Sequence, residues 1–158
     1  MSIQSFHTAP NQFVQLIQEI SSVYHFELEN ELAYLRLEKK CYNLTIEKLE
    51  KNIVRISQTR QLNRETICDP EIEFLRQLRP IEDDKNKEFW TPLRISQAFE
   101  HRQVAWIDRD GEIINVDADG TEKIADFCKE WTEQILSHQW LNNKKPSRGV
   151  IATFRYSL

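Results

Sequence analysis

The sequence predicts an α+β fold, in which an antiparallel sheet (a meander plus a hairpin) packs against an N-terminal and a C-terminal amphipathic helix. Three observations lead to this prediction. Apolar residues recur at helical spacing near both ends of the chain, they alternate with polar residues over 33–77, and an Asp-Gly pair separates two β-rich runs over 103–116. Helices covering one face of an antiparallel sheet accommodate all three patterns in a single domain over residues 1–158.

The first helix is expected over 8–24. Pro10 falls in its first turn, where the missing N–H of proline costs little. The side chains that then recur every three or four residues are Phe13, Leu16, Ile17, Ile20 and Tyr24. This spacing puts them on one side of a helix, facing the core.

Residues 31–60 fit two patterns. Apolar residues occupy most seam positions of a heptad repeat between Leu32 and Ile56, which suits a coiled-coil hairpin. The alternation in 42–47 (YNLTIE) and the many β-branched residues favour strands instead. We therefore expect a meander over 33–77. Its turns contain no glycine and depend on asparagines, which tolerate turn conformations best among the other residues: Asn30, Asn43, Asn52 and Asn63.

The boundaries between elements are clearer in the second half of the chain. The charged segment 80–90 predicts a polar loop, and 93–99 a short helical turn. The turn Asp108–Gly111 between two β-rich runs predicts a hairpin. An acidic cap at Asp119-Gly120-Thr121-Glu122 then opens the last helix, and a closing strand follows over 149–157. The apolar face of that helix consists of Ile124, Phe127, Cys128, Trp131 and Ile135.

This order of elements, with DPEIEFL at 69–75 and FCKEW at 127–131, resembles a group of small bacterial proteins built as helix, meander and helix. The resemblance covers most of the chain and implies the same fold. Its motifs are apolar and structural, so it carries over no catalytic residue.

Composition excludes several classes of protein. The chain has only three glycines, and none precedes residue 111, so a glycine-rich phosphate loop is excluded. Its formal charge of −4 argues against a dedicated duplex-binding protein. The three cysteines are far apart and form no CxxC pair, which predicts reduced thiols in a cytoplasmic protein. No signal peptide or membrane span is apparent, and we expect no cofactor.

The last helix carries a row of acidic residues opposite its apolar face: Glu122, Asp126, Glu130 and Glu133. A solvated face is the ordinary explanation of such a row. Its functional interpretation is a docking surface for a basic partner, because a concentrated field speeds encounter. Our first hypothesis is therefore a non-catalytic protein-interaction or accessory regulatory module. Its partner is another protein, with a second copy of this chain as a further candidate.

The alternative hypothesis is a nucleic-acid-associated accessory protein that uses the basic C-terminal segment. Residues 142–158 contain four basic and no acidic side chains. The candidate contacts are Arg55, Arg60, Arg64, Lys144, Lys145 and Arg148. Binding through such contacts would fall steeply with salt.

A calcium loop is the most specific motif match in the chain. Asn115, Asp117, Asp119 and Asp126 stand at positions 1, 3, 5 and 12 of such a loop, with Gly120 at position 6. Asparagine at position 1 and the short Asp126 at position 12 depart from the pattern. We therefore favour the competing interpretation, a strand end followed by a capped helix, where acidic residues are favourable.

No catalytic constellation stands out. The four histidines are scattered, and neither HExxH nor GxSxG occurs. Cys68 beside Asp69, with a distant His101, could form a thiol dyad only if the fold brought them together. We therefore expect no enzyme activity.

Overall fold

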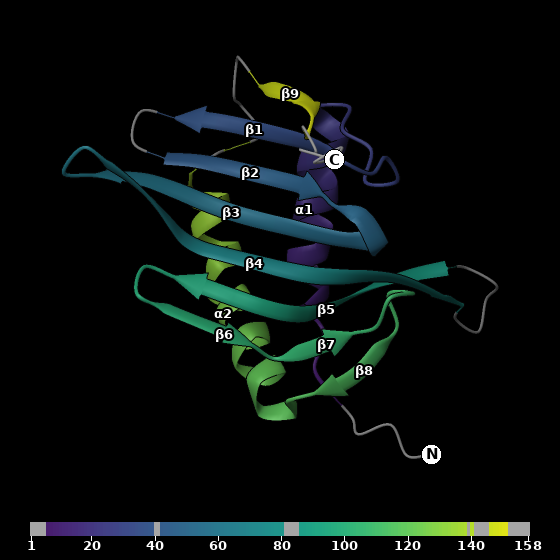
Figure 1. Ribbon diagram of the computed structural model, residues 1–158. Coiled ribbons are helices and arrows are strands. Elements are labelled where there is room, and N and C mark those ends of the chain that lie inside the picture. Colours follow the sequence, from purple (N-terminus) through teal and green to yellow (C-terminus); the bar gives the residue numbers. More distant parts are fainter. Residues whose placement is uncertain (1–5, 40–41, 81–85, 139, 141–145, 152–158) are drawn as a thin grey trace, which may run out of the picture.

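Alternating side chains build a seven-stranded antiparallel sheet with the strand order β6-β5-β4-β3-β2-β1-β9 (Figure 1). The computed structural model describes residues 6–39, 42–80, 86–138, 140 and 146–151. The strands of this sheet are β1 (Ala33–Lys39), β2 (Tyr42–Lys48), β3 (Ile53–Leu62), β4 (Glu65–Pro80), β5 (Asn86–Gln97), β6 (Glu100–Gln103) and β9 (Ser147–Val150). The predicted α+β class is confirmed.

The meander is confirmed, and the coiled-coil interpretation of 31–60 is wrong. Alternate side chains such as Leu35 and Ile46 are fully buried, which a paired strand explains. Asn52 and Asn63 have positive φ angles of 60° and 50° in the turns before β3 and β4, as expected. Asn43, by contrast, lies inside β2 and supplies no turn.

Two local predictions around β5 were wrong. The polar loop expected at 80–90 is shorter, because β4 continues to Pro80 and β5 begins at Asn86; residues 81–85 lie outside the described part. The helical turn expected at 93–99 is instead the second half of β5 and the turn into β6. Cross-strand pairing with β4 from Asn86 to Ser96 outweighs the local signal of charge.

Two helices, α1 (Asn11–Val23) and α2 (Ala118–Ser137), cover one face of the sheet (Figure 1). Pro10 is the N-cap residue of α1 rather than part of its first turn. The core between helices and sheet is aromatic at its centre. The ring centroid of Phe13 on α1 lies 5.5 Å from those of Phe74 on β4 and Trp131 on α2.

The predicted hairpin is confirmed as β7 (Ala105–Ile107) and β8 (Ile113–Val116), which pair as a separate two-stranded sheet. Gly111 has φ of 80° in its turn, a conformation that glycine adopts without strain. The inward side chains of the hairpin cover a second apolar cluster on the helix-free face, which centres on Leu75, Leu93 and Ala105. The hairpin therefore closes one end of that face.

The last helix begins earlier than predicted. Its N-cap is Asp117 rather than a residue of 119–122, and the Asp117 carboxylate accepts a hydrogen bond from the Gly120 backbone N–H at 3.1 Å. The closing strand is present as β9, which pairs antiparallel with β1. The rest of the predicted strand, 152–157, lies outside the described residues.

Candidate functional site

The acidic row predicted on the last helix lies on the solvent side of α2. The side chains of Glu122, Asp126, Glu130 and Glu133 are all exposed. The opposite side of the helix is buried in the core, including Trp131. Asp126 has a basic neighbour, because Lys129 Nζ lies 3.5 Å from its carboxylate. We call Glu122, Asp126, Glu130 and Glu133 the acidic face.

The structure does not assemble the predicted calcium ligands. Asp117 and Asp119 lie 2.8 and 3.9 Å from the guanidinium of Arg102. Asp126 lies about 10 Å further along the same helix than Asp119, at the usual rise per residue. Asn115 is exposed in β8, where its side-chain oxygen accepts a hydrogen bond from the next backbone N–H. No group of three or more His, Cys, Asp or Glu side chains in the described residues could hold a metal ion.

Arg102 and the helix cap have a clear electrostatic consequence. The Arg102 guanidinium and the Gly120 N–H both donate to Asp117, and together they lower the pKa of its carboxyl below the ordinary value of 3.8. The same ion pair raises the pKa of Arg102. The acidic residues at this strand end therefore cap a helix, as the competing interpretation proposed.

The predicted basic contacts are dispersed rather than gathered. Arg60 pairs with Asp69 at 3.4 Å, and Arg64 is exposed in the turn between β3 and β4. Arg148, on β9, donates a hydrogen bond to the Tyr24 backbone oxygen at 2.6 Å. Lys144 and Lys145 lie outside the described residues.

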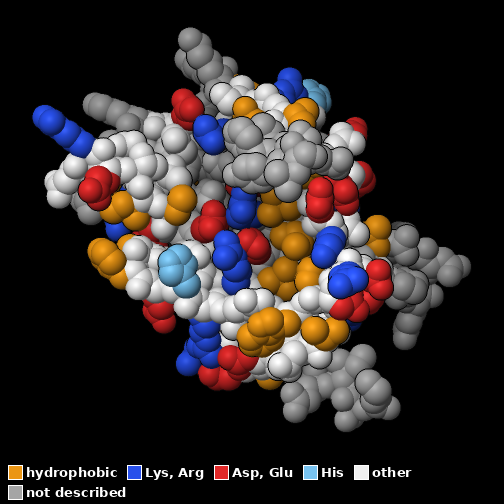
Figure 2. All heavy atoms as spheres, viewed as in Figure 1, with side chains coloured by type: hydrophobic (Ala, Val, Ile, Leu, Met, Phe, Trp, Pro, Cys, Tyr) orange, Lys and Arg blue, Asp and Glu red, His pale blue; other side chains and the backbone are white. Residues whose placement is uncertain are grey.

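Arg55 belongs to an ion-pair network on the helix-free face of the sheet, whose mixed blue and red centre is visible in Figure 2. Its Nε and Nη2 donate to both oxygens of Glu47, at 3.0 and 2.8 Å. Glu71 on β4 links it to Arg94 on β5, which also pairs with Glu73. The hydrogen bond to Glu47 is the main reason that the pKa of Arg55 is raised. The positive charge of Arg55 is therefore balanced by carboxylates of the same sheet.

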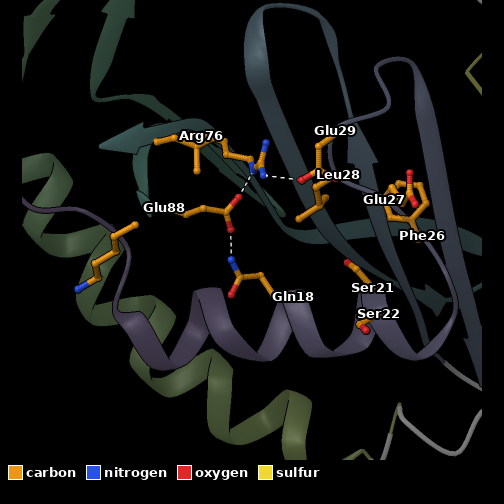
Figure 3. Close-up of a pocket in the computed structure, with 11 residues that line it drawn as sticks. Gln18, Ser21, Ser22, Phe26, Glu27, Leu28, Glu29, Arg76 and Glu88 are labelled. Carbon is orange, nitrogen blue, oxygen red and sulfur yellow. Dashed lines mark hydrogen bonds and ion pairs between the residues drawn. The ribbon is translucent and has the colours of Figure 1, made fainter. Parts of the chain in front are cut away.

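The structure also contains an open cleft that the sequence did not reveal (Figure 3). It has a volume of about 680 Å³ and lies where α1 and the loop 24–32 meet β4 and β5. We call it the α1 cleft. Its lining residues are Gln18, Ser21, Ser22, Phe26, Glu27, Leu28, Glu29, Arg76, Leu78, Lys87 and Glu88.

An ion pair between Arg76 and Glu88 forms the polar wall of the α1 cleft. Their side chains are only 9% and 11% exposed. Arg76 Nε donates to Glu88, which also accepts a hydrogen bond from the Gln18 side chain on α1. Arg76 Nη2 donates to Glu29 at 3.0 Å, and the Glu29 side chain is 69% exposed. One arginine thus joins a buried carboxylate to one at the surface.

Lys48 adds a second buried base beside this wall. Its side chain is about 1% exposed, and burial lowers its pKa below the ordinary value of 10.5. The nearby carboxylates Glu31 and Glu29 act in the opposite direction, whereas the Arg76 charge adds to the lowering. The electrostatics of this region therefore couple three segments that are distant in sequence.

One sequence signal could have located this site. Arg76 follows Ile72 and Phe74 at the inward positions of β4, and Lys48 follows Leu44 and Ile46 at those of β2. A charged residue in the core-facing register of an alternating strand is seldom buried without a partner. Such a residue therefore marks a buried polar site.

The fold gives Cys68 and His101 different partners, so the condition for a thiol dyad is not met. His101 on β6 pairs with Ser96 on β5, where their Nδ1 and Oγ atoms are 2.7 Å apart. Cys68 lies in β4 opposite Thr59 of β3. Partial burial and the Glu71 charge raise the pKa of the Cys68 thiol, and complete burial raises that of Cys128 much further. Both shifts favour the thiol over the nucleophilic thiolate.

Comparison with known proteins identifies no relative: the chain matches no protein-family model, no curated protein and no solved structure. Among the described residues, no helix is long and apolar enough to cross a membrane. The fold and these surfaces define an α+β protein with an acidic helix face and a charged cleft, and function has to be argued from those two features.

Proposed function

We propose that this protein is a non-catalytic, cytoplasmic interaction module that docks a basic segment of another protein on its acidic face. The observation that supports this most is the division of α2 into two sides. All four carboxylates of the acidic face are exposed, whereas the opposite side of the helix is buried in the core. The charged side is therefore available to a partner without any change in the fold.

Repulsion between its like charges favours binding of a basic partner to the acidic face. Like-charged residues four apart on a helix destabilise it by roughly 0.2–0.5 kcal/mol per pair. Glu122, Asp126 and Glu130 have this spacing, and Lys129 offsets only part of the repulsion. A lysine- or arginine-rich partner would neutralise the remaining repulsion between these carboxylates. The negative potential of the acidic face would also attract such a partner, most strongly at low salt.

Reversal of the charges tests this proposal. The triple variant Glu122→Lys, Asp126→Lys, Glu130→Lys and the wild type are used as tagged baits in the same lysate, and retained proteins are quantified by mass spectrometry. A partner of the acidic face is retained by the wild type and lost from the variant. A second triple variant, Glu50→Lys, Glu65→Lys, Glu112→Lys, makes the same change in net charge at exposed sites away from α2.

The control variant decides whether position or net charge matters. We expect it to retain the partner, and circular dichroism should show that both variants are folded. Equal retention by the wild type and the α2 variant would contradict the proposal. Equal loss from both variants would reduce it to an unspecific charge effect. Size-exclusion chromatography with light scattering tests whether the partner is a second copy of this chain.

The nucleic-acid alternative has less support, because Arg55 and Arg60 are already paired with carboxylates and Arg148 with a backbone oxygen. It is tested by treating half of the lysate with nuclease. Partners that disappear after this treatment would favour the alternative, whereas a partner that survives it supports docking on the acidic face.

A further inference from the structure

Arg76 is the buried base in the wall of the α1 cleft, and the buried Lys48, which does not line the cleft, interacts electrostatically with Arg76 and Glu29. Glu88, whose side chain is 11% exposed, is the least exposed carboxylate among those that contact Arg76 in the described residues. The nearby carboxylates Glu29 and Glu31 lie at the surface on the loop between α1 and β1. Glu88 occupies one side of the Arg76 guanidinium, and the side that faces the open cleft favours a second anionic group, because a buried charge is costly without partners.

Glu29 currently supplies that anionic group. Its carboxylate accepts from Arg76 Nη2 at 3.0 Å although most of the side chain remains in solvent (Figure 3). The pair is half-buried, since the Arg76 side chain is 9% exposed, but at its Glu29 end water and salt screen the charges and the exposed side chain loses freedom. The contact between Glu29 and Arg76 is therefore easily exchanged, whereas that between Glu88 and Arg76 is buried and fixed.

The loop that carries Glu29 has an unusual backbone at both ends. His25 and Leu32 have positive φ angles of 56° and 58°, a region that histidine adopts more often than most non-glycine residues and leucine adopts rarely. Such residues persist where the surroundings hold them, and they are a recognised feature of segments that clamp ligands. Glu29 is therefore presented to Arg76 by a loop whose two ends are conformationally constrained.

We propose that the α1 cleft binds a small carboxylate with an apolar tail, whose carboxylate takes the place of Glu29 on Arg76. The position already accepts a carboxylate in the structure, which identifies the chemistry of the ligand. Leu78, which is 54% exposed, provides apolar surface beside it for the tail, and the largely buried side chains of Phe26 and Leu28 line the same cleft. The volume of about 680 Å³ is in the range of small-molecule sites.

Octanoate is a suitable probe, with calorimetry on the purified full-length protein as the readout. Glu29→Ala removes the competing carboxylate and should tighten octanoate binding about threefold to fivefold. Glu27→Ala is the matched control, because Glu27 lines the same cleft on the same loop and the same charge is removed. Its affinity should stay within about twofold of the wild type, since Glu27 makes no ion pair with Arg76 among the described contacts.

Octan-1-ol, which has the same tail without the charge, should bind at least about tenfold more weakly than octanoate, because it offers Arg76 no carboxylate. Three results would each overturn the proposal. They are no octanoate binding by wild type or Glu29→Ala up to about 10 mM, no difference between Glu29→Ala and Glu27→Ala, and equal binding of octanol. Inorganic phosphate that binds Glu29→Ala as tightly as octanoate would also overturn the assignment to carboxylates. These assays involve no protein partner, so their outcome is independent of docking on α2.

Discussion

The indole Nε1 of Trp131 donates a hydrogen bond of 2.9 Å to the side-chain oxygen of Gln58, and this contact ties α2 to the centre of the sheet. Both residues are buried. The tryptophan ring also stacks on Phe13 of α1, so a single side chain contacts all three parts of the core. Its polar atom finds a partner in an otherwise apolar region, as buried tryptophans usually do.

Trp131→Phe should lower the free energy of unfolding by about 2–3 kcal/mol, because the Gln58 amide loses its partner in a dry environment and ring volume is lost. Gln58→Leu alone leaves the indole N–H unpaired and should also destabilise. The double variant should be more stable than the sum of the two single effects by about 1 kcal/mol. Urea denaturation of the four proteins measures this coupling, and strictly additive effects would contradict it.

Gly120 is required by a close approach rather than by its backbone angles. A Cβ added there would lie 2.5 Å from Cγ1 of Val104, the residue between β6 and β7. Gly120→Ala should therefore destabilise the protein by about 1–3 kcal/mol through overpacking, although alanine is the better helix former. Val104→Ala should rescue part of that loss. Thermal unfolding of both single variants and the double variant tests this, and an independent effect of each change would contradict it.

The fold could be predicted largely from local sequence patterns. The errors in that prediction have a common cause. Alternation identified the meander, and Asp108–Gly111 identified the hairpin, because both signals are contained in a few consecutive residues. The first half of β5 was predicted as loop because 80–90 is charged and contains no alternating apolar face. Its strand conformation comes from pairing with β4, a contact that no short window of sequence contains.

The candidate sites could likewise be predicted only where their residues lie in one segment of the sequence. The exposure of the acidic face followed from helical periodicity alone, since its residues lie opposite the apolar side of one helix. The α1 cleft could not be found in this way, because Gln18, Glu29, Arg76 and Glu88 come from four different segments. The calcium motif failed for a related reason. Its spacing was correct, but helix propensity continues through 118–126 and holds Asp126 away from the loop.

Asp117→Asn should separate the charge of the α2 cap from its hydrogen bond, because asparagine caps helices as well as aspartate does. The Asp117 pKa is lowered in the folded protein, so the stability that its charge provides is complete above the ordinary value of 3.8 and is lost as the pH falls through the folded value. The wild type should therefore have the higher Tm at pH 7, and the difference should shrink as the pH falls below 3.8 and close below the folded pKa of Asp117. Asp119→Asn, whose carboxylate is 3.9 Å from Arg102, should lower Tm less. A pH-independent difference would show that the charge of Asp117 is not involved.

Lys48→Met should stabilise the protein at pH 7 by about 1 kcal/mol, because methionine fills a similar volume without a buried charge. The pKa of Lys48 is lowered by burial, so between its folded value and 10.5 the unfolded chain holds more protons and wild-type stability rises with pH. That rise should disappear in the variant, and the two proteins should converge towards pH 10.5. Urea denaturation between pH 7 and pH 10 measures both effects, with the exposed Lys123→Met as the control. A variant less stable than the wild type at pH 7 would mean that Glu29 and Glu31 stabilise the buried ammonium by more than its desolvation costs.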